Sequence, residues 1–200
     1  MKTDGYHHGA LHEAILDAAV EEASRSGPQA IGVRALAKAV GVSPSAIYRH
    51  VPSIDALLAE ASQVARQHLA ARMIEQRENV PNHRNPIDRA SARLRAIGRA
   101  YVEFALSEPH LFDTAFTPAS STPPKPDDPS AWQVVVDGVQ ELVDAGALRP
   151  TVASDAVLVA WSSVHGIASI LRRGLRMNPV TDDHAIDVVL DGVRRSIEAL

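Results

Sequence analysis

The chain has 200 residues, of which 46% are hydrophobic and 22% charged, with a net charge of −4 and no cysteine. The length allows one good core, or a small module joined to a larger one, and the lack of cysteine excludes disulfides, thiolate metal sites and cysteine nucleophiles. Because the apolar residues are mostly Ala, Val, Leu and Ile, we expect an all-helical fold.

Four helices are predicted in the first part of the chain. Gly27-Pro28 ends the first of them and Gly41 ends the second, because glycine terminates helices and proline cannot continue them. Ser43 and Pro44 are the residue types favoured at the cap and first position of the third. The apolar spacing predicts these four helices over residues 9–26, 33–40, 44–50 and 53–79.

A linker at 80–86 with two prolines separates this region from further helices, and residues 117–129, with five prolines, are predicted to form a loop. No stretch shows the alternation of a strand. The expected fold is all-α, with about nine helices in an N-terminal domain over 1–60 and a C-terminal domain over 61–200. The later helices are predicted over 87–107, the segment through Leu111 and Phe116, 130–145, 152–173 and 182–200.

The two short helices over 33–40 and 44–50 are joined by Gly41-Val42-Ser43 and braced by the longer helix before them. Two short helices joined in this way indicate a helix-turn-helix, whose second helix lies in the major groove of DNA. Pro44 at its tip adds no N–H that would need a partner beside the duplex. A DNA-binding role follows as the first functional hypothesis.

The side chains of the second short helix suit that role. Ser45 and Ala46 are small enough for base edges to approach, and Tyr48 and His50 can donate to phosphates. Arg49 can read a guanine or bind a phosphate. Residues 28–55 carry three basic residues against one acidic residue, a modest charge that two subunits would double.

The stretch "IGVRALAKAVGVSPSAIYRHVPSIDALL", residues 31–58, resembles the DNA-binding domain of the TetR family of bacterial transcriptional repressors, over roughly residues 8–60. The segments "YHHGAL", "LRAIGRAYVEFALSEPHLFDTAF" and "WSSVHGI" resemble the subgroup named for its Trp-x-x-x-His-Gly motif, here Trp161, His165 and Gly166. The resemblance implies an all-helical dimer that a small molecule in the C-terminal domain releases from operator DNA.

Carried over by position, the resemblance implies that residues on and beside the helix-turn-helix contact DNA. Two positions depart from the family pattern. Gly32 stands where many members have Ser or Thr as a cap, and Ile54 stands where Lys is usual, so one phosphate contact is missing. The implied DNA contacts are Arg34, Ser43, Pro44, Ser45, Ala46, Tyr48, Arg49 and His50.

Aromatic and polar residues on apolar faces of the C-terminal helices are candidates for binding the effector. Trp161 and His165 lie four residues apart, on one helical face, so an apolar wall with one hydrogen-bonding group is possible. The alternative is that these residues only pack in the core. The near absence of Lys and Arg favours an apolar or weakly polar effector. The candidates are Tyr101, Phe104, Phe112, Phe116, Trp161 and His165.

The last two helices carry a pattern typical of helix pairing. Apolar residues of the final helix recur at intervals of four and three, and the helix before it is apolar on more than one face. Two copies of this pair could form an intermolecular four-helix bundle; alternatively both helices only complete the monomer's core. The residues proposed for the dimer interface are Val157, Val164, Ile186, Leu190, Val193 and Ile197.

Other classes of function find little support. The sequence has no Gly-x-Ser-x-Gly elbow, no dinucleotide or phosphate loop and no zinc-protease helix, so an enzyme, a metal site or a cofactor is not expected. The start lacks a signal-peptide pattern, and the longest uncharged stretch is too short and polar for a membrane span, which indicates a cytoplasmic protein. The remaining alternative is a helical dimeric adaptor that does not bind DNA.

Overall fold

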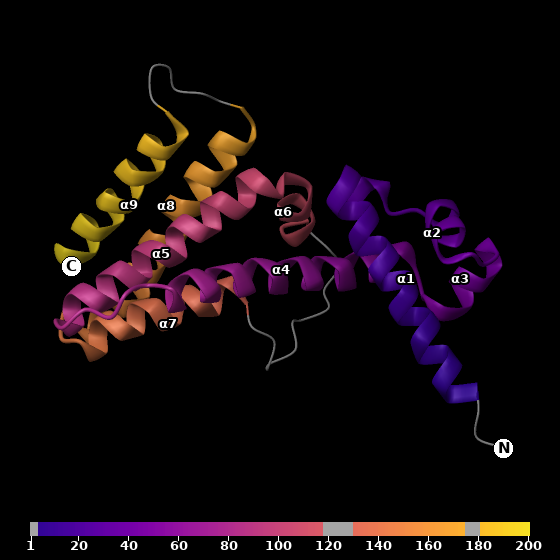
Figure 1. The fold of residues 1–200 in the computed structure, drawn as a ribbon, viewed down its shortest axis with the longest axis horizontal. Coiled ribbons are helices and arrows are strands. Elements are labelled where there is room, and N and C mark those ends of the chain that lie inside the picture. The colour runs from indigo at the N-terminus through magenta and orange to yellow at the C-terminus, as the bar shows by residue number, and fades with distance from the viewer. Residues whose placement is uncertain (1–3, 118–129, 175–180) are drawn as a thin grey trace. The chain divides into compact units, whose positions relative to one another are not determined.

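The computed structural model describes residues 4–117, 130–174 and 181–200, and in these ranges the chain is all-α, with no strand. The predicted helices are confirmed, with ends that shift by a few residues. Two single turns of 3-10 helix were not predicted. The elements in chain order (Figure 1) are α1 (Asp4–Ser26), η1 (Pro28–Ala30), α2 (Val33–Val40), α3 (Pro44–His50), α4 (Ile54–Glu78), α5 (Pro86–Ser107), α6 (Pro109–Ala115), α7 (Ala131–Asp144), η2 (Pro150–Val152), α8 (Ala153–Arg172) and α9 (Asp182–Glu198).

The chain divides into two compact units, called unit 1 and unit 2 below. Unit 1 comprises the described residues of 1–66 and 108–128, and unit 2 those of 67–107 and 129–200. The boundary expected near residue 60 therefore falls inside α4, which begins in unit 1 and ends in unit 2. Unit 1 also contains α6, because this helix packs against α1 and η1.

The core of unit 1 forms where α1, α2, α3 and the start of α4 meet. Ile15, Leu36, Ile47 and Leu57 are fully buried there, so one apolar face from each helix fixes the arrangement of all four. Gly41 adopts a left-handed conformation with φ 77°, which a side chain would disfavour, and this allows the sharp turn from α2 into α3. Figure 1 shows α2 and α3 beside α1 at the N-terminal end of the chain.

Unit 2 is a helical bundle in which α5 packs against α7, α8 and α9. Gly98 and Gly138 allow the helices to approach closely. A Cβ at Gly98 would lie 2.6 Å from Leu190 Cδ2, and one at Gly138 would lie 2.8 Å from Ile97 Cδ1. By length and composition alone Pro150–Arg172 could cross a membrane, but the inner face of α8 is buried in this bundle, as expected for a core helix.

Candidate functional site

The helix α3 has the start that its sequence predicts. The Ala46 N–H donates to the Ser43 hydroxyl at 3.3 Å, and Pro44 occupies the first turn, where it leaves no donor unsatisfied. Ile47 is fully buried against the core of unit 1. The opposite face carries Tyr48, whose side chain is 61% exposed. A short helix is thus held by its inner face with its outer face open.

Most of the predicted DNA-contacting residues are exposed on α2, α3 and the turn between these helices. Arg34, the turn residues and Arg49 are exposed, while His50 is half-buried. Ala46 is the exception. Its exposed fraction is only 8%, which contradicts the prediction that Ala46 faces base edges. The exposed residues, called the α3 surface below, are Arg34, Ser43, Pro44, Ser45, Tyr48 and Arg49.

A histidine of α1, not identified from the sequence, ties α3 to α4. His12 Nδ1 lies 3.1 Å from the carbonyl oxygen of His50, and His12 Nε2 lies 2.7 Å from a Glu60 carboxylate oxygen. The hydrogen bond to Glu60 raises the pKa of His12 despite partial desolvation. Both partners are acceptors, so only the protonated imidazole can donate to both at once. The end of α3 is therefore anchored by an ionisable group.

In unit 2, three of the predicted effector residues meet. The Tyr101 hydroxyl lies 2.7 Å from His165 Nδ1, and the Trp161 ring stacks on the His165 ring with centroids 6.3 Å apart. Trp132, which the sequence did not single out, contacts Trp161 edge-on. Burial raises the pKa of Tyr101; burial, and then Arg172, lower the pKa of His165. The pair is consequently neutral near pH 7 and joined by one hydrogen bond.

The other predicted effector residues are divided between the two units. Phe104 is buried on α5. Phe112 and Phe116 belong to unit 1, where their ring centroids lie 4.8 Å apart at the end of α6. No local pattern marks this division, because α6 follows α5 directly and only its packing against α1 and η1 assigns it to unit 1.

Known family models match both the N-terminal and the C-terminal part of the chain. Residues 15–61 match the bacterial regulatory proteins of the tetR family, and residues 94–193, half of the chain, match the tetracyclin repressor-like C-terminal domain. The chain belongs to the TetR family of transcriptional regulators. It is therefore a DNA-binding regulator, from a family of transcription regulators rather than enzymes.

Individual relatives agree with this membership. The chain is 25% identical over 165 residues to the uncharacterized HTH-type transcriptional regulator YobS of Bacillus subtilis, covering 82% of this chain and 81% of that one. A structure of a protein with unknown function from Rhodococcus sp. RHA1 is 26% identical, with TM-score 0.77 and coverage of 98% and 100%. A TetR variant from Acinetobacter baumannii AYE in complex with minocycline shares the fold at 17% identity, TM-score 0.63 and coverage of 92% and 94%.

In this TetR-family protein, the residues predicted to form a dimer interface are instead buried within a single chain. Val157, Val164, Ile186, Leu190, Val193 and Ile197 are all at most 7% exposed within a single chain. They form the seam between α8, α9 and the rest of unit 2, so they are core residues and offer no surface to a second copy. The most exposed large apolar side chains of α8 and α9 are Leu158, Ile170 and Val188.

Proposed function

We propose that this TetR-family regulator is a cytoplasmic repressor, which binds a palindromic operator as a homodimer and is released by a small apolar or weakly polar molecule. The observation that carries the proposal is the α3 surface. Tyr48 and Arg49 are exposed on a helix whose other face, through Ile47, is fixed in the core of unit 1. A rigid helix with an open polar face is what groove recognition requires.

Each residue of this surface has a distinct part in the proposed contact. Arg49 reads a guanine edge or binds a phosphate, while Tyr48 donates to a phosphate. Arg34 of α2 binds the backbone, and the turn residues, Ser43 among them, fit against the duplex. The Ser43 hydroxyl already accepts from Ala46 N–H and lies 2.9 Å from the Ser45 hydroxyl. Ser45 is thus the freer of the two to reach a base.

Two features support dimerisation through the outer faces of α8 and α9. Leu158 is 60% exposed and Val188 is 50% exposed, although each lies on a helix of the bundle. Gly166 of α8 has nothing within 4 Å of the position where a Cβ would stand, whereas packing within the chain accounts for Gly98. Close approach by a second copy would account for Gly166 and cover the exposed apolar side chains. An operator of two half-sites follows from such symmetry, with centres about 34 Å or a multiple apart.

The test begins with selection of genomic fragments by the purified protein, followed by fluorescence anisotropy on the recovered duplex. Arg49→Ala should weaken binding at least tenfold, because each bidentate base contact contributes about 1–3 kcal/mol and a dimer loses two. Tyr48→Ala should also weaken it. The matched control is Arg25→Ala at the end of α1, which removes the same charge from an exposed residue of unit 1 outside the α3 surface.

The controls separate the outcomes. Arg25→Ala should bind the duplex with an affinity within about threefold of wild type. If Arg49 binds a phosphate, Arg49→Ala should also reduce the slope of log binding constant against log salt concentration, by about 0.9 per lost contact. Equal affinity of Arg49→Ala, Tyr48→Ala and wild type for the selected duplex would contradict the proposed interface. Binding to the duplex with a folded monomer as the active species would contradict the proposed dimer.

A further inference from the structure

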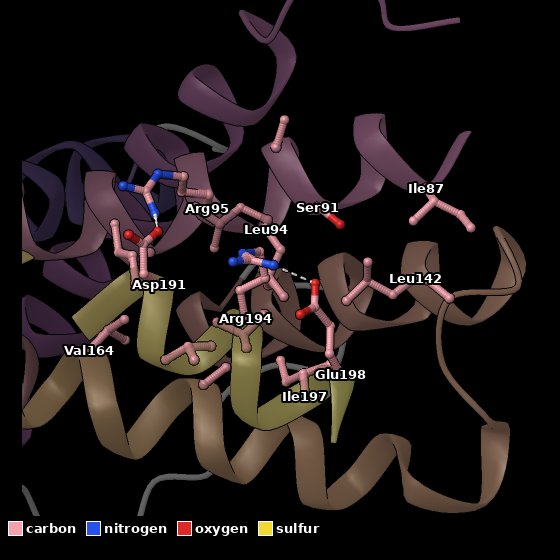
Figure 2. Close-up of a pocket in the computed structure, with 18 residues that line it drawn as sticks. Ile87, Ser91, Leu94, Arg95, Leu142, Val164, Asp191, Arg194, Ile197 and Glu198 are labelled. Carbon is pink, nitrogen blue, oxygen red and sulfur yellow. Dashed lines mark hydrogen bonds and ion pairs between the residues drawn. The ribbon is translucent and has the colours of Figure 1, made fainter. Parts of the chain in front are cut away.

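Unit 2 has a partly open cavity of about 440 Å³ lined by residues of α5, α7, α8 and α9 and of the turn after α7. This volume lies in the range of pockets that bind small molecules. Tyr101, Trp161 and His165 are not among its lining residues. The cavity is therefore distinct from the aromatic cluster to which the sequence directed attention. Figure 2 shows Leu94, Leu142 and Val164 among its apolar walls. Ile97, Val135 and Leu190 also line it.

The walls of the cavity are tightly packed, so the space is not a product of loosely assembled helices. A Cβ added at Gly98 would lie 2.6 Å from Leu190 Cδ2 and 3.2 Å from Val164 Cγ1. Both of these side chains line the cavity, and both are at most 5% exposed. The cavity opens to solvent where its charged residues lie, since the side chains of Arg95, Asp191, Arg194 and Glu198 are 38%, 47%, 51% and 56% exposed. A small molecule can therefore reach the apolar walls from outside.

The polar groups of the cavity are held in ion pairs. Arg95 lies 2.6 Å from Asp191 and 2.6 Å from Asp187, and Arg194 lies 2.6 Å from Glu198. Figure 2 shows the pairs of Arg95 with Asp191 and of Arg194 with Glu198 among the lining residues. Each arginine has a carboxylate partner, so the cavity offers no excess charge to a ligand. The one uncharged polar side chain that lines it is that of Ser91.

We propose that this cavity is the effector site of the regulator, and that it binds an uncharged, largely apolar molecule with a single hydrogen-bonding group. The proposal rests on the proposed function, since it supplies the place and the chemistry of the effector. A formal charge on the ligand would have to compete with carboxylates or arginines that are already paired, which disfavours acids and amines. Hydrocarbon contact with the walls provides the affinity, and Ser91 can bond the polar group.

The position of α9 suggests how occupancy reaches the dimer. Its inner face lines the cavity through Leu190, Val193 and Ile197. Its outer face carries Val188 on the surface proposed for dimerisation. A ligand that displaces the inner face must move the outer face as well, because both belong to one rigid helix. The effector would thus change the pairing of two subunits, and with it the separation of their α3 surfaces.

The test uses the full chain and Nile red, an uncharged dye whose emission rises in apolar surroundings. Ala92→Phe places a ring in the cavity from a half-buried position, and should lower dye affinity at least tenfold. Ala96→Phe is the matched control, one turn further along α5, equally half-buried and not among the lining residues. Ala147→Phe fills the cavity from the turn after α7, and serves if Ala92→Phe does not fold by circular dichroism.

Competition then tests the ligand class. 1-Decanol should displace Nile red, and decanoate, the charged counterpart with the same chain, should be at least tenfold weaker. Trp161→Phe should leave dye affinity within about threefold of wild type. Absence of saturable dye binding, unchanged affinity in folded Ala92→Phe or Ala147→Phe, loss of binding in Trp161→Phe, or equal displacement by decanoate would each overturn the proposal.

Operator affinity, measured separately by fluorescence anisotropy, distinguishes a failure of this proposal from a failure of the proposed function. Ala96→Phe, whose position is not among the lining residues, should bind both the selected duplex and Nile red like wild type. A wild-type protein that binds the dye in the cavity but binds no duplex would refute repression and leave a ligand site. A protein that binds the duplex but not the dye would refute the cavity as an effector site and leave the regulator.

Discussion

Protonation of His12 should strengthen unit 1 and the seating of α3. Below its pKa the imidazole donates to the His50 carbonyl and the Glu60 carboxylate together, while the neutral ring can donate to only one of them. Because the folded-state pKa is raised above the ordinary value of 6.5, this stabilisation is fully present below pH 6.5. It is lost as the pH rises through the folded-state pKa. The charge of Glu13 also raises the pKa of His12.

The size of the effect follows from the two contacts. A hydrogen bond to a charged partner contributes about 1.5–3 kcal/mol when it is well shielded. The His12 and Glu60 side chains are 32% and 39% exposed, so solvent weakens the pair. We expect a coupling free energy of about 1 kcal/mol between them at pH 5.5, falling to under about 0.5 kcal/mol at pH 8.5. His12→Gln keeps the polarity of the side chain but can never carry the charge.

A double-mutant cycle with His12→Gln and Glu60→Gln measures this coupling by urea unfolding at both pH values. Both tryptophans, Trp132 and Trp161, lie in unit 2, so unit 1 must be followed separately. Hydrogen exchange of the peptide spanning 44–51 provides that readout, and its protection should decline from pH 5.5 to 8.5 in wild type, after correction for the intrinsic exchange rate. A coupling energy that is the same at both pH values would refute the reasoning.

Two further predictions concern unit 2. Burial, and then Arg172, lower the pKa of His165, so unfolding takes up a proton below pH 6.5. The contribution of this group to the stability of unit 2 should be complete above pH 6.5 and decline as the pH falls. This pH dependence is opposite in sign to that of His12. Urea titrations followed by tryptophan fluorescence at pH 7.5 and 5.5 check this, and His165→Gln should remove most of the slope; a slope retained in full would contradict the assignment. Gly166→Ala should add about 1 kcal/mol of helix propensity to an isolated chain, but weaken a dimer in which a second copy approaches this point. Equilibrium ultracentrifugation measures the association, and a dissociation constant unchanged from wild type would exclude close contact there.

The helices were predictable because their ends depend on residues that are close together in the sequence. Gly41 stops α2 through its left-handed conformation, and Ser43 with Pro44 starts α3 through a cap that needs neighbours only three residues away. The exposure of Tyr48 and Arg49 followed from the apolar spacing of the same short helix. The burial of Ala46 did not, because a methyl group fits either face and its size alone suggested an approach by DNA.

Contacts between distant segments were not predictable. His12 meets His50 and Glu60 across separations of 38 and 48 residues, and no local pattern marks such a triad. The cavity of unit 2 was missed for a related reason. Its walls are ordinary Leu, Ile and Val side chains, and only the relative placement of α5, α7, α8 and α9 leaves a space between them. The aromatic residues predicted to bind the effector instead include a stacked pair, Trp161 and His165, that does not line the cavity.

The pattern on α9 shows what helical periodicity can and cannot decide. Apolar residues at intervals of four and three identify the face that is covered, and that face, which includes Leu190 and Ile197, is covered. The spacing carries no information on which surface covers it, and here the cover comes from the same chain. A second copy must then use what remains outside the seam, where Val188 stands exposed. The helix so placed has the proposed effector cavity on one side and the proposed subunit contact on the other. If both proposals hold, a change in the cavity alters the dimer without any change in α3 itself.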